Sequence, residues 1–185
     1  MSKIILIRHT RPDIPEGLCY GHSDVPYERD AFLAWQSQVP WPETYRVYSS
    51  PLKRCHDLAL KALPGPVCID HRLKELHFGL WENRLWSELP REDTERWTSD
   101  YLNQAPPEGE TVQDLTLRLR SFILDLSEGD ESHIVFSHAG VIRLLLLAAY
   151  GEGLGQYFVR TVDFGSIVIL PRRPQAFDFD RLLER

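Results

Sequence analysis

The sequence predicts an α/β fold with a mostly parallel central sheet. Short runs of apolar, β-branched residues alternate along the chain with longer segments of helical periodicity, as they do where helices connect parallel strands. The first run, Ile4–Ile7, has four consecutive apolar residues, which indicates a strand that is buried on both faces. A chain of 185 residues is long enough for one substantial core and short for two, so we expect a single domain over residues 1–185.

The remaining elements follow from local signals. After the first strand we expect strands at residues 45–49, 66–69, 132–137 and 166–170, and helices at residues 28–38, 51–63, 111–126 and 141–150, with one or two short helices between 84 and 102. Residues 11–27 are rich in Pro, Gly and Asp and form a long loop, which in a folded domain usually has a function. Trp86, Leu89 and Trp97 are interpreted as packing residues rather than as part of a ligand-binding site.

Two helices have clear start signals. Ser50 is typical of an N-cap and Pro51 of a first helical residue. Thr111 and Asp114 make a capping pair before a stretch whose apolar residues keep helical spacing along one face. The last long helix, 141–150, is apolar on nearly all sides, which indicates that it lies buried against the sheet.

Composition narrows the function classes. The chain is 43% hydrophobic and 26% charged, as in ordinary soluble globular proteins. Its net charge of −6 argues against a general nucleic-acid binder, whose surface would be basic. Three cysteines without metal-site or disulfide spacing favour a reducing compartment. The longest apolar run, Leu144–Ala149, is too short to cross a bilayer, and the N-terminal run is too short for a signal peptide. We therefore expect a cytoplasmic protein with no membrane or nucleic-acid partner, and the oligomeric state stays open.

Basic and imidazole side chains follow three of the predicted strands. Arg8 and His9 end the first, Arg54 begins the helix after the second, and His138 follows the fourth. Because parallel strands place their carboxyl ends at one edge of a sheet, we expect these side chains to converge. Arginines and helix N-termini bind phosphate oxygens, so the cluster suits a tetrahedral dianion. Guanidinium groups disfavour a metal cation, and no dinucleotide or Walker motif is present, so we expect neither a metal nor another cofactor.

Each residue also has a purely structural interpretation. Arg8 and His9 would then cap a strand and face solvent. Arg54 would extend into solvent, because a cation at a helix N-terminus is unfavourable. Glu75 lies among Leu, Phe and Trp, a desolvated setting that suits a carboxyl acting as an acid; the alternative is a surface glutamate with buried neighbours. Cys55 is interpreted as a packing residue rather than a nucleophile.

Five short blocks carry a resemblance to a known family. They are Leu6–Thr10, Ser49–Arg54, Glu75–Glu82, Gly109–Thr111 and Ser137–Gly140, and the segment Val162–Ser166 is also similar. Their order resembles that of the histidine phosphatase superfamily, also called phosphoglycerate-mutase-like, over nearly the whole chain. The resemblance implies a three-layer sandwich with helices on both faces of the sheet. Thr10, Arg11 and Pro12 depart from the family pattern, which usually has Gly, then Glu or Gln, then Thr. Of these we expect Arg11 to be a solvated surface side chain.

The resemblance implies a role for each matching residue. His9 would take the phosphoryl group as a phosphohistidine, and Arg8, Arg54 and His138 would bind the phosphoryl oxygens. Glu75 would protonate the departing alkoxide and then activate water, so His9, Glu75 and His138 form the expected catalytic set. His9 must attack as a neutral imidazole. We therefore expect a backbone carbonyl to orient its ring and flanking cations to lower its pKa.

Two stretches, Ile7–Asp13 and Gly17–Pro26, further resemble the α-ribazole phosphatase branch of this superfamily. Its members remove the 5′-phosphate of α-ribazole phosphate, or of cobalamin phosphate, late in cobalamin biosynthesis. The implied partner is thus a small-molecule phosphomonoester. The alternatives are a phosphatase for another small phosphomonoester, a phosphoglycerate-mutase-type phosphotransferase, and a phosphoryl-binding module without catalysis. The last is disfavoured because binding needs neither a nucleophile nor a poised carboxyl. His22 lies in the loop expected to cover the pocket.

Overall fold

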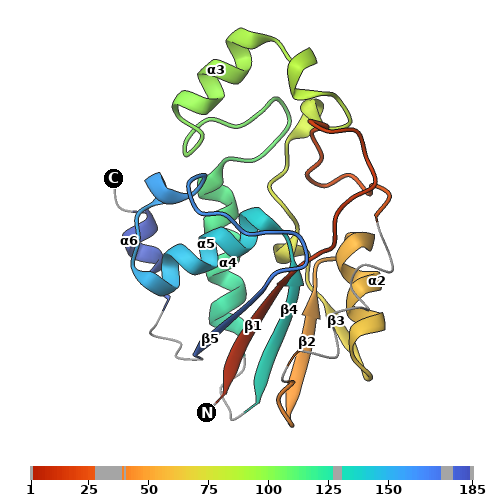
Figure 1. Ribbon diagram of the computed structural model, residues 1–185. Helices are drawn as coiled ribbons and strands as arrows, with labels where there is room; N and C mark the ends of the chain where they lie inside the picture. Colours follow the sequence, from red (N-terminus) through yellow and green to blue (C-terminus); the bar gives the residue numbers. More distant parts are fainter. Residues whose placement is uncertain (1, 28–38, 40, 127–130, 172–176, 184–185) are drawn as a thin grey trace.

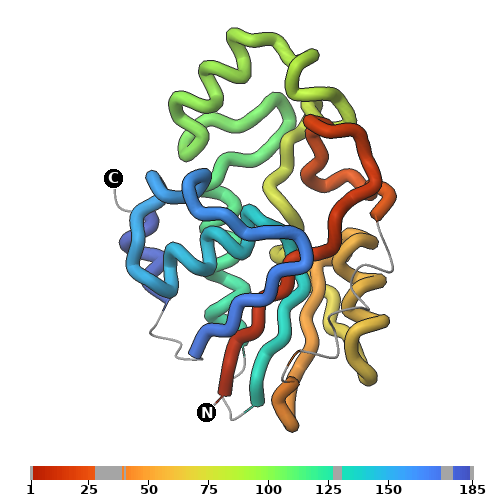
Figure 2. The backbone as a smooth tube through the Cα atoms, viewed as in Figure 1, coloured from red at the N-terminus to blue at the C-terminus, as the bar shows by residue number. Residues whose placement is uncertain are grey.

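A five-stranded sheet forms the centre of the molecule (Figures 1 and 2). The computed structural model describes residues 2–27, 39, 41–126, 131–171 and 177–183. The strands are β1 (Lys3–Arg8), β2 (Tyr45–Ser49), β3 (Val67–Ile69), β4 (Ser132–Ser137) and β5 (Ile167–Pro171). They lie in the order β3-β2-β4-β1-β5, and only the pairing of β5 with β1 is antiparallel among these strands. The predicted α/β fold with a mostly parallel sheet is confirmed.

Helices lie on both faces of this sheet, as expected. In Figure 1, α2 lies on one side and α4, α5 and α6 on the other. The α-helices are α2 (Lys53–Ala62), α3 (Arg91–Ser99), α4 (Val112–Asp125), α5 (Ala139–Tyr150) and α6 (Phe179–Leu183), and the 3-10 helices are η1 (His71–Leu73), η2 (Gly79–Trp81), η3 (Trp86–Glu88) and η4 (Leu154–Gln156). The helix predicted at 28–38 lies outside the described residues. Across the described part of the chain, no helix has the length and apolar character needed to cross a membrane.

Alternate side chains of β1 enter two separate hydrophobic clusters. Ile4 and Leu6 pack in the cluster that contains the apolar faces of α4 and α5. Ile5 and Ile7 pack in the cluster that contains Leu58 and the other buried apolar residues of α2. None of the four isoleucine and leucine side chains is more than 2% exposed. The strand is therefore buried on both faces, as its unbroken apolar run predicts.

Two helices begin two residues away from their predicted starts. α2 begins at Lys53 rather than at the proline, and the predicted cap of Ser50 is wrong. The Ser50 hydroxyl lies 3.4 Å from the Leu52 amide but 2.8 Å from His138 Nε2, so it faces the strand ends instead of capping the helix. α5 begins early, at Ala139, because β4 leads directly into it. Both shifts occur at the sheet edge where the predicted site residues lie.

Backbone hydrogen bonds join the long loop 11–27 to the segment that follows η2, which is far from the loop in the sequence (Figures 1 and 2). The Cys19 amide donates to Arg84 O at 2.8 Å, and the Asn83 amide donates to Cys19 O at 2.8 Å. The Trp86 amide donates to Gly17 O at 2.9 Å. These backbone bonds place the loop beside the carboxyl ends of the parallel strands.

Candidate active site

His9 follows β1, and its ring is oriented by the backbone. Its Nδ1 lies 2.7 Å from Thr10 O, so Nδ1 carries the proton and Nε2 keeps a free lone pair. The side chain is 2% exposed. Burial first, and then the charges of Arg54 and Arg8, hold the pKa of His9 well below its usual range. The ring is therefore a neutral imidazole at pH 7, with a basic nitrogen able to act as a nucleophile. The expected carbonyl and cations are present, although burial is the larger cause.

Arg8 stacks on an aromatic ring beside His9. Its guanidinium carbon lies 3.6 Å from the centre of the Phe164 ring, and Nη1 donates to Val162 O. The Phe164 ring centre lies 5.6 Å from that of His9. Burial lowers the pKa of Arg8, and the Glu75 carboxylate opposes this. The guanidinium is thus held by Phe164 and Val162 O and is close enough to interact with the Glu75 charge, so it does not simply cap the strand.

Arg54 is 1% exposed, although it lies in the first turn of α2. Nη1 donates to Ser23 O at 2.8 Å and Nη2 to Gly21 O at 2.7 Å. Its guanidinium carbon lies 5.2 Å from the centre of the Tyr20 ring. The alternative of a solvated Arg54 is therefore wrong, because the long loop encloses the guanidinium and supplies carbonyl acceptors for it.

His138 is fully buried at the N-cap of α5 and lies edge-on to His9, with 5.2 Å between ring centres. Its Nε2 lies 2.8 Å from Ser50 Oγ and 3.5 Å from Cys55 Sγ. Burial, and then the charge of Arg54, hold the pKa of His138 well below its usual range, so this ring is also neutral. Cys55 is fully buried, and burial raises the pKa of its thiol. A protonated, buried thiol is a packing group, as predicted, and not a nucleophile.

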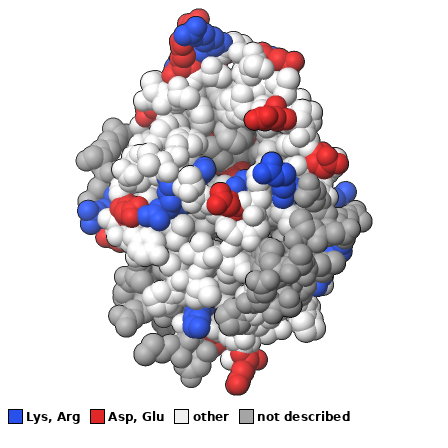
Figure 3. Space-filling model, viewed as in Figure 1, with Lys and Arg blue, Asp and Glu red and all other residues white. Residues whose placement is uncertain are grey.

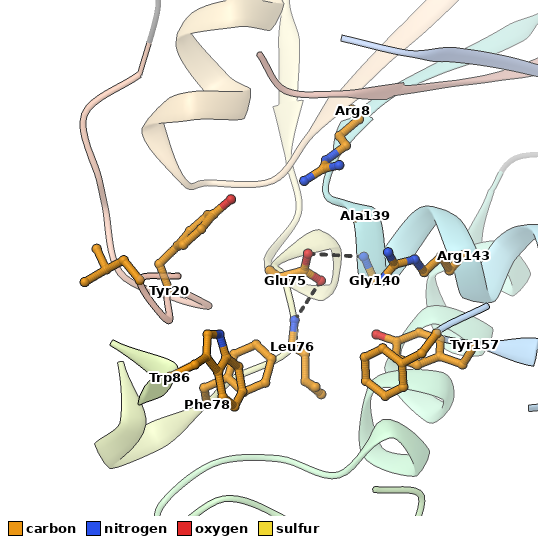
Figure 4. Close-up of a pocket in the computed structure, with 12 residues that line it drawn as sticks. Arg8, Tyr20, Glu75, Leu76, Phe78, Trp86, Ala139, Gly140, Arg143 and Tyr157 are labelled. Atoms are coloured by element: carbon orange, nitrogen blue, oxygen red, sulfur yellow. Dashed lines mark hydrogen bonds between the residues drawn. The ribbon is translucent and has the colours of Figure 1, made fainter. Parts of the chain in front are cut away.

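Two backbone amides hold the Glu75 carboxylate (Figure 4). The Leu76 amide donates to Oε1 at 3.0 Å, and the Gly140 amide donates to Oε2 at 3.1 Å. A Cβ atom on Gly140 would lie 2.3 Å from Glu75 Oε1 and 2.5 Å from the Tyr157 hydroxyl, so only glycine fits there. Because Glu75 lines a pocket with these groups, the alternative of a plain surface glutamate is wrong.

Glu75 and Arg8 share one pocket of about 200 Å³ with several aromatic side chains (Figure 4). The aromatic residues that line it are Tyr20, Phe78, Trp86, Tyr157 and Phe158. Of the four predicted residues at the strand ends, Arg8 lines this pocket, whereas His9, Arg54 and His138 lie buried next to it with 2% exposure or less. In the space-filling view, basic and acidic side chains lie close together around a hollow on this face (Figure 3).

Tyr20 and Arg143 line the pocket although they were not predicted from the sequence, and Trp86, predicted only as a packing residue, lines it too. Arg143 Nε donates to Arg160 O at 2.8 Å, and its side chain lies beside Gly140 (Figure 4). The helical spacing of three between Gly140 and Arg143 was a usable signal, because residues three apart share a helix face. Tyr20 had no comparable signal beyond its place in the long loop.

Two further residues named from the sequence lie outside this pocket. Arg11 is exposed, as predicted, with its guanidinium carbon 5.5 Å from the Phe164 ring centre. His22 packs behind Glu75 instead of covering the pocket, with Nε2 at 2.9 Å from Glu75 O. Among the residues that the structure describes, no group of three or more His, Cys, Asp or Glu side chains is arranged to hold a metal ion.

Residues 4–184 match the histidine phosphatase superfamily, branch 1. A bifunctional protein of Mycobacterium tuberculosis is 30% identical over 184 residues, covering 91% of this chain but 50% of that protein, so the chain spans about half the length of this relative. An adenosylcobalamin/alpha-ribazole phosphatase of Salmonella typhimurium is 37% identical over 156 residues, which cover 78% of this chain and 77% of that enzyme. The crystal structure of the alpha-ribazole phosphatase from Shigella flexneri superposes with a TM-score of 0.82 and 28% identity, covering 95% of this chain and 92% of that one.

Proposed function

This chain belongs to branch 1 of the histidine phosphatase superfamily, and we propose that it is a phosphomonoester hydrolase that forms a phosphohistidine on His9. One observation carries the proposal. The buried His9 ring is neutral and its Nδ1 proton is engaged by Thr10 O, which leaves the Nε2 lone pair for attack on phosphorus. We treat residues 1–185 as one histidine phosphatase domain.

The proposed reaction has two steps. In the first, His9 Nε2 bonds to phosphorus, the bond from phosphorus to the substrate oxygen breaks, and Glu75 gives the leaving oxygen a proton. In the second, Glu75 takes a proton from water, the water oxygen bonds to phosphorus and the bond to Nε2 breaks, releasing phosphate. Arg8, Arg54 and His138 supply donors to the phosphoryl oxygens in both steps, which stabilises the transferring charge.

The substrate proposed for this site is α-ribazole 5′-phosphate, which places the protein in cobalamin biosynthesis. The Salmonella typhimurium relative named for this activity supports the proposal at 37% identity. Phe78 and Trp86 line the pocket beside Glu75 and give it apolar, aromatic surface that suits a flat leaving group. A phosphoglycerate-type substrate is the alternative, since Arg143 adds a cation to the same pocket that suits a carboxylate.

The first test is the hydrolysis of a chromogenic phosphomonoester by the wild type and by His9→Ala. Loss of the nucleophile should lower kcat by at least about 10³-fold. His71→Ala, which removes an exposed imidazole, is the matched control and should keep wild-type activity. Rapid-quench labelling should find acid-labile phosphate on His9. Full activity in His9→Ala, or a phosphoryl adduct on another residue, would contradict the mechanism.

The second test compares kcat/KM for α-ribazole phosphate, a sugar phosphate and a phosphoglycerate. We expect α-ribazole phosphate to be preferred by at least about 10-fold, because a bound flat ring buries apolar surface that smaller leaving groups lack. A preference for the phosphoglycerate would favour the alternative and would leave the phosphohistidine mechanism standing.

A further inference from the structure

His22 makes contacts that the proposed mechanism does not use. Its Nε2 lies 2.9 Å from the backbone oxygen of Glu75, 53 residues away in the sequence. We propose that His22 is a positioning residue, which holds the Glu75 backbone so that the carboxyl meets the leaving oxygen. This inference rests on the proposed function, because His22 would position Glu75 for its proposed role as the general acid.

The direction of this hydrogen bond follows from the chemistry of its two atoms. A carbonyl oxygen carries no proton, so His22 Nε2 is the donor and Glu75 O is the acceptor. Burial, and then the neighbouring His77, lower the pKa of His22 to about 4. The ring is therefore neutral at pH 7, and its single proton lies on Nε2. His77 stacks on the ring with 4.3 Å between centres and 19° between planes, which restricts its orientation.

A second donor reaches the same carbonyl from α4. Arg118 Nη2 donates to Glu75 O at 2.9 Å. Glu110 holds this guanidinium through bonds of 2.6 and 3.1 Å, and its carboxylate also accepts from the His77 amide at 3.0 Å. The carbonyl of Glu75 is thus held from two sides, by His22 of the long loop and by Arg118 of a core helix.

The backbone around His22 is fixed as well. Its amide donates to Glu82 Oε1 at 2.8 Å. The preceding residue, Gly21, accepts from Arg54 Nη2 at 2.7 Å, and a Cβ atom on Gly21 would lie 2.1 Å from Leu76 O. The segment therefore packs backbone against backbone on the residue after Glu75. It links the guanidinium proposed to bind phosphoryl oxygens with the carboxyl proposed to protonate the leaving group.

This arrangement predicts a selective kinetic defect. Removing the His22 donor takes away one of the two hydrogen bonds described for the Glu75 carbonyl and leaves that of Arg118, so the backbone can shift by a small amount. Small misplacements of a general acid slow proton transfer. Proton transfer matters for a poor leaving group and not for one that departs as a stable anion. kcat/KM reports the steps up to the first irreversible one, which here is phosphoryl transfer to His9, so it isolates the step in which Glu75 acts as an acid.

The experiment compares phenyl phosphate, which has a poor leaving group, with 2,4-dinitrophenyl phosphate, which has a good one. His22→Phe keeps a ring against His77 but has no donor, and His22→Gln keeps a side-chain N–H. We expect His22→Phe to lower kcat/KM for phenyl phosphate by at least about 10-fold and to change it less than about 2-fold for the dinitrophenyl ester. His22→Gln should recover most of the loss.

His71→Phe is the matched control, because it makes the same histidine-to-phenylalanine change at an exposed position. Equal losses on both esters would mean that His22 only maintains the fold, and no loss on either would mean that its hydrogen bond is dispensable. Both results overturn the proposal, as does a failure of His22→Gln to recover activity. If His22→Phe does not fold, His22→Leu tests the same prediction without a ring.

Glu75→Gln tests the proposed role of Glu75 as the general acid separately from the proposed role of His22. The variant should show the same discrimination between the two esters, with a larger loss on phenyl phosphate of at least about 10²-fold. Discrimination in Glu75→Gln but not in the His22 variants would overturn the role of His22 alone. If Glu75→Gln affects both esters equally, Glu75 is not the general acid, and the proposed role of His22 is then wrong as well.

Discussion

Gly140 lies where the α5 backbone meets Glu75, and the space beside it is smaller than a methyl group. We expect Gly140→Ala to lower kcat/KM for a substrate with a poor leaving group by about 10²-fold. The new Cβ would lie too close to Glu75 Oε1, so the carboxylate must move away from its position in the wild type. Alanine is the better helix former, so helix propensity does not account for a loss. The measurement is steady-state kinetics beside urea unfolding.

Gly153→Ala is the matched control for this prediction. No atom lies within 4 Å of a Cβ built on Gly153, and its φ of −81° suits any residue. It should keep the activity and stability of the wild type. Wild-type kcat/KM in Gly140→Ala would show that the tight contact with the carboxylate has no kinetic consequence.

The departure of Thr10, Arg11 and Pro12 from the family pattern leaves the orientation of His9 intact. The ring is held by the backbone oxygen of Thr10, which any residue at that position supplies. Pro12 pairs in an isolated antiparallel bridge with Tyr27, so the proline begins the long loop instead of interrupting the sheet. Thr10 and Pro12 are buried and Arg11 is exposed, and the bond that orients the His9 ring needs none of the three side chains.

At the scale of elements, α4 packs its apolar face in the hydrophobic core and carries Arg118, which donates to the Glu75 carbonyl. Its N-terminus has the predicted capping box. The Asp114 amide donates to Thr111 Oγ1 and the Thr111 amide donates to Asp114 Oδ2, each at 3.0 Å. We expect Thr111→Ala to lower the free energy of unfolding by about 1 kcal/mol, as measured in urea, because the Asp114 amide loses its acceptor and the Asp114 carboxylate loses the Thr111 hydroxyl as a donor.

Thr98→Ala serves as the comparison for this cap. Thr98 lies near the exposed end of α3, where its hydroxyl donates to Glu95 O within the same helix. Its substitution should change the free energy of unfolding by less than about 0.5 kcal/mol. A similar value for Thr111→Ala would mean that the box contributes no more than an ordinary surface bond.

At the scale of the whole molecule, buried neutral histidines make stability depend on pH. The pKa values of His9 and His138 are lowered in the folded state from 6.5, and that of His22 to about 4. Below pH 6.5 the unfolded chain binds protons that the folded chain excludes. The free energy of unfolding should therefore fall as the pH drops from 6.5 toward the folded pKa values, by about 1.4 kcal/mol per pH unit for a fully buried histidine. Above pH 6.5 these groups contribute no slope.

Urea unfolding of the wild type and of His138→Gln at about pH 7.5 and pH 5.5 checks this expectation. The variant lacks one buried imidazole, so its loss of stability between the two pH values should be smaller than that of the wild type. Carboxylates titrate equally in both proteins and cancel in the comparison. An identical pH dependence would show that His138 takes up a proton in the folded state.

Local patterns in the sequence were sufficient for the strands, for the helix faces and for the convergence of Arg8, His9, Arg54 and His138. They suffice because apolar periodicity and caps act over a few residues, and because parallel strands bring their ends to one edge whatever their order. A family resemblance added the roles now proposed for these side chains.

The tertiary structure alone decided the strand order, the enclosure of Arg54 by loop carbonyls, and the contact of His22 with Glu75. Each joins groups that are far apart in the chain, and each depends on how a long loop and several elements pack together. Periodicity carries no information on such contacts, because a loop has no repeating face. The convergence of the proposed nucleophile with the neighbouring cations was therefore predictable from the sequence, whereas the support of the proposed acid became visible only in the fold.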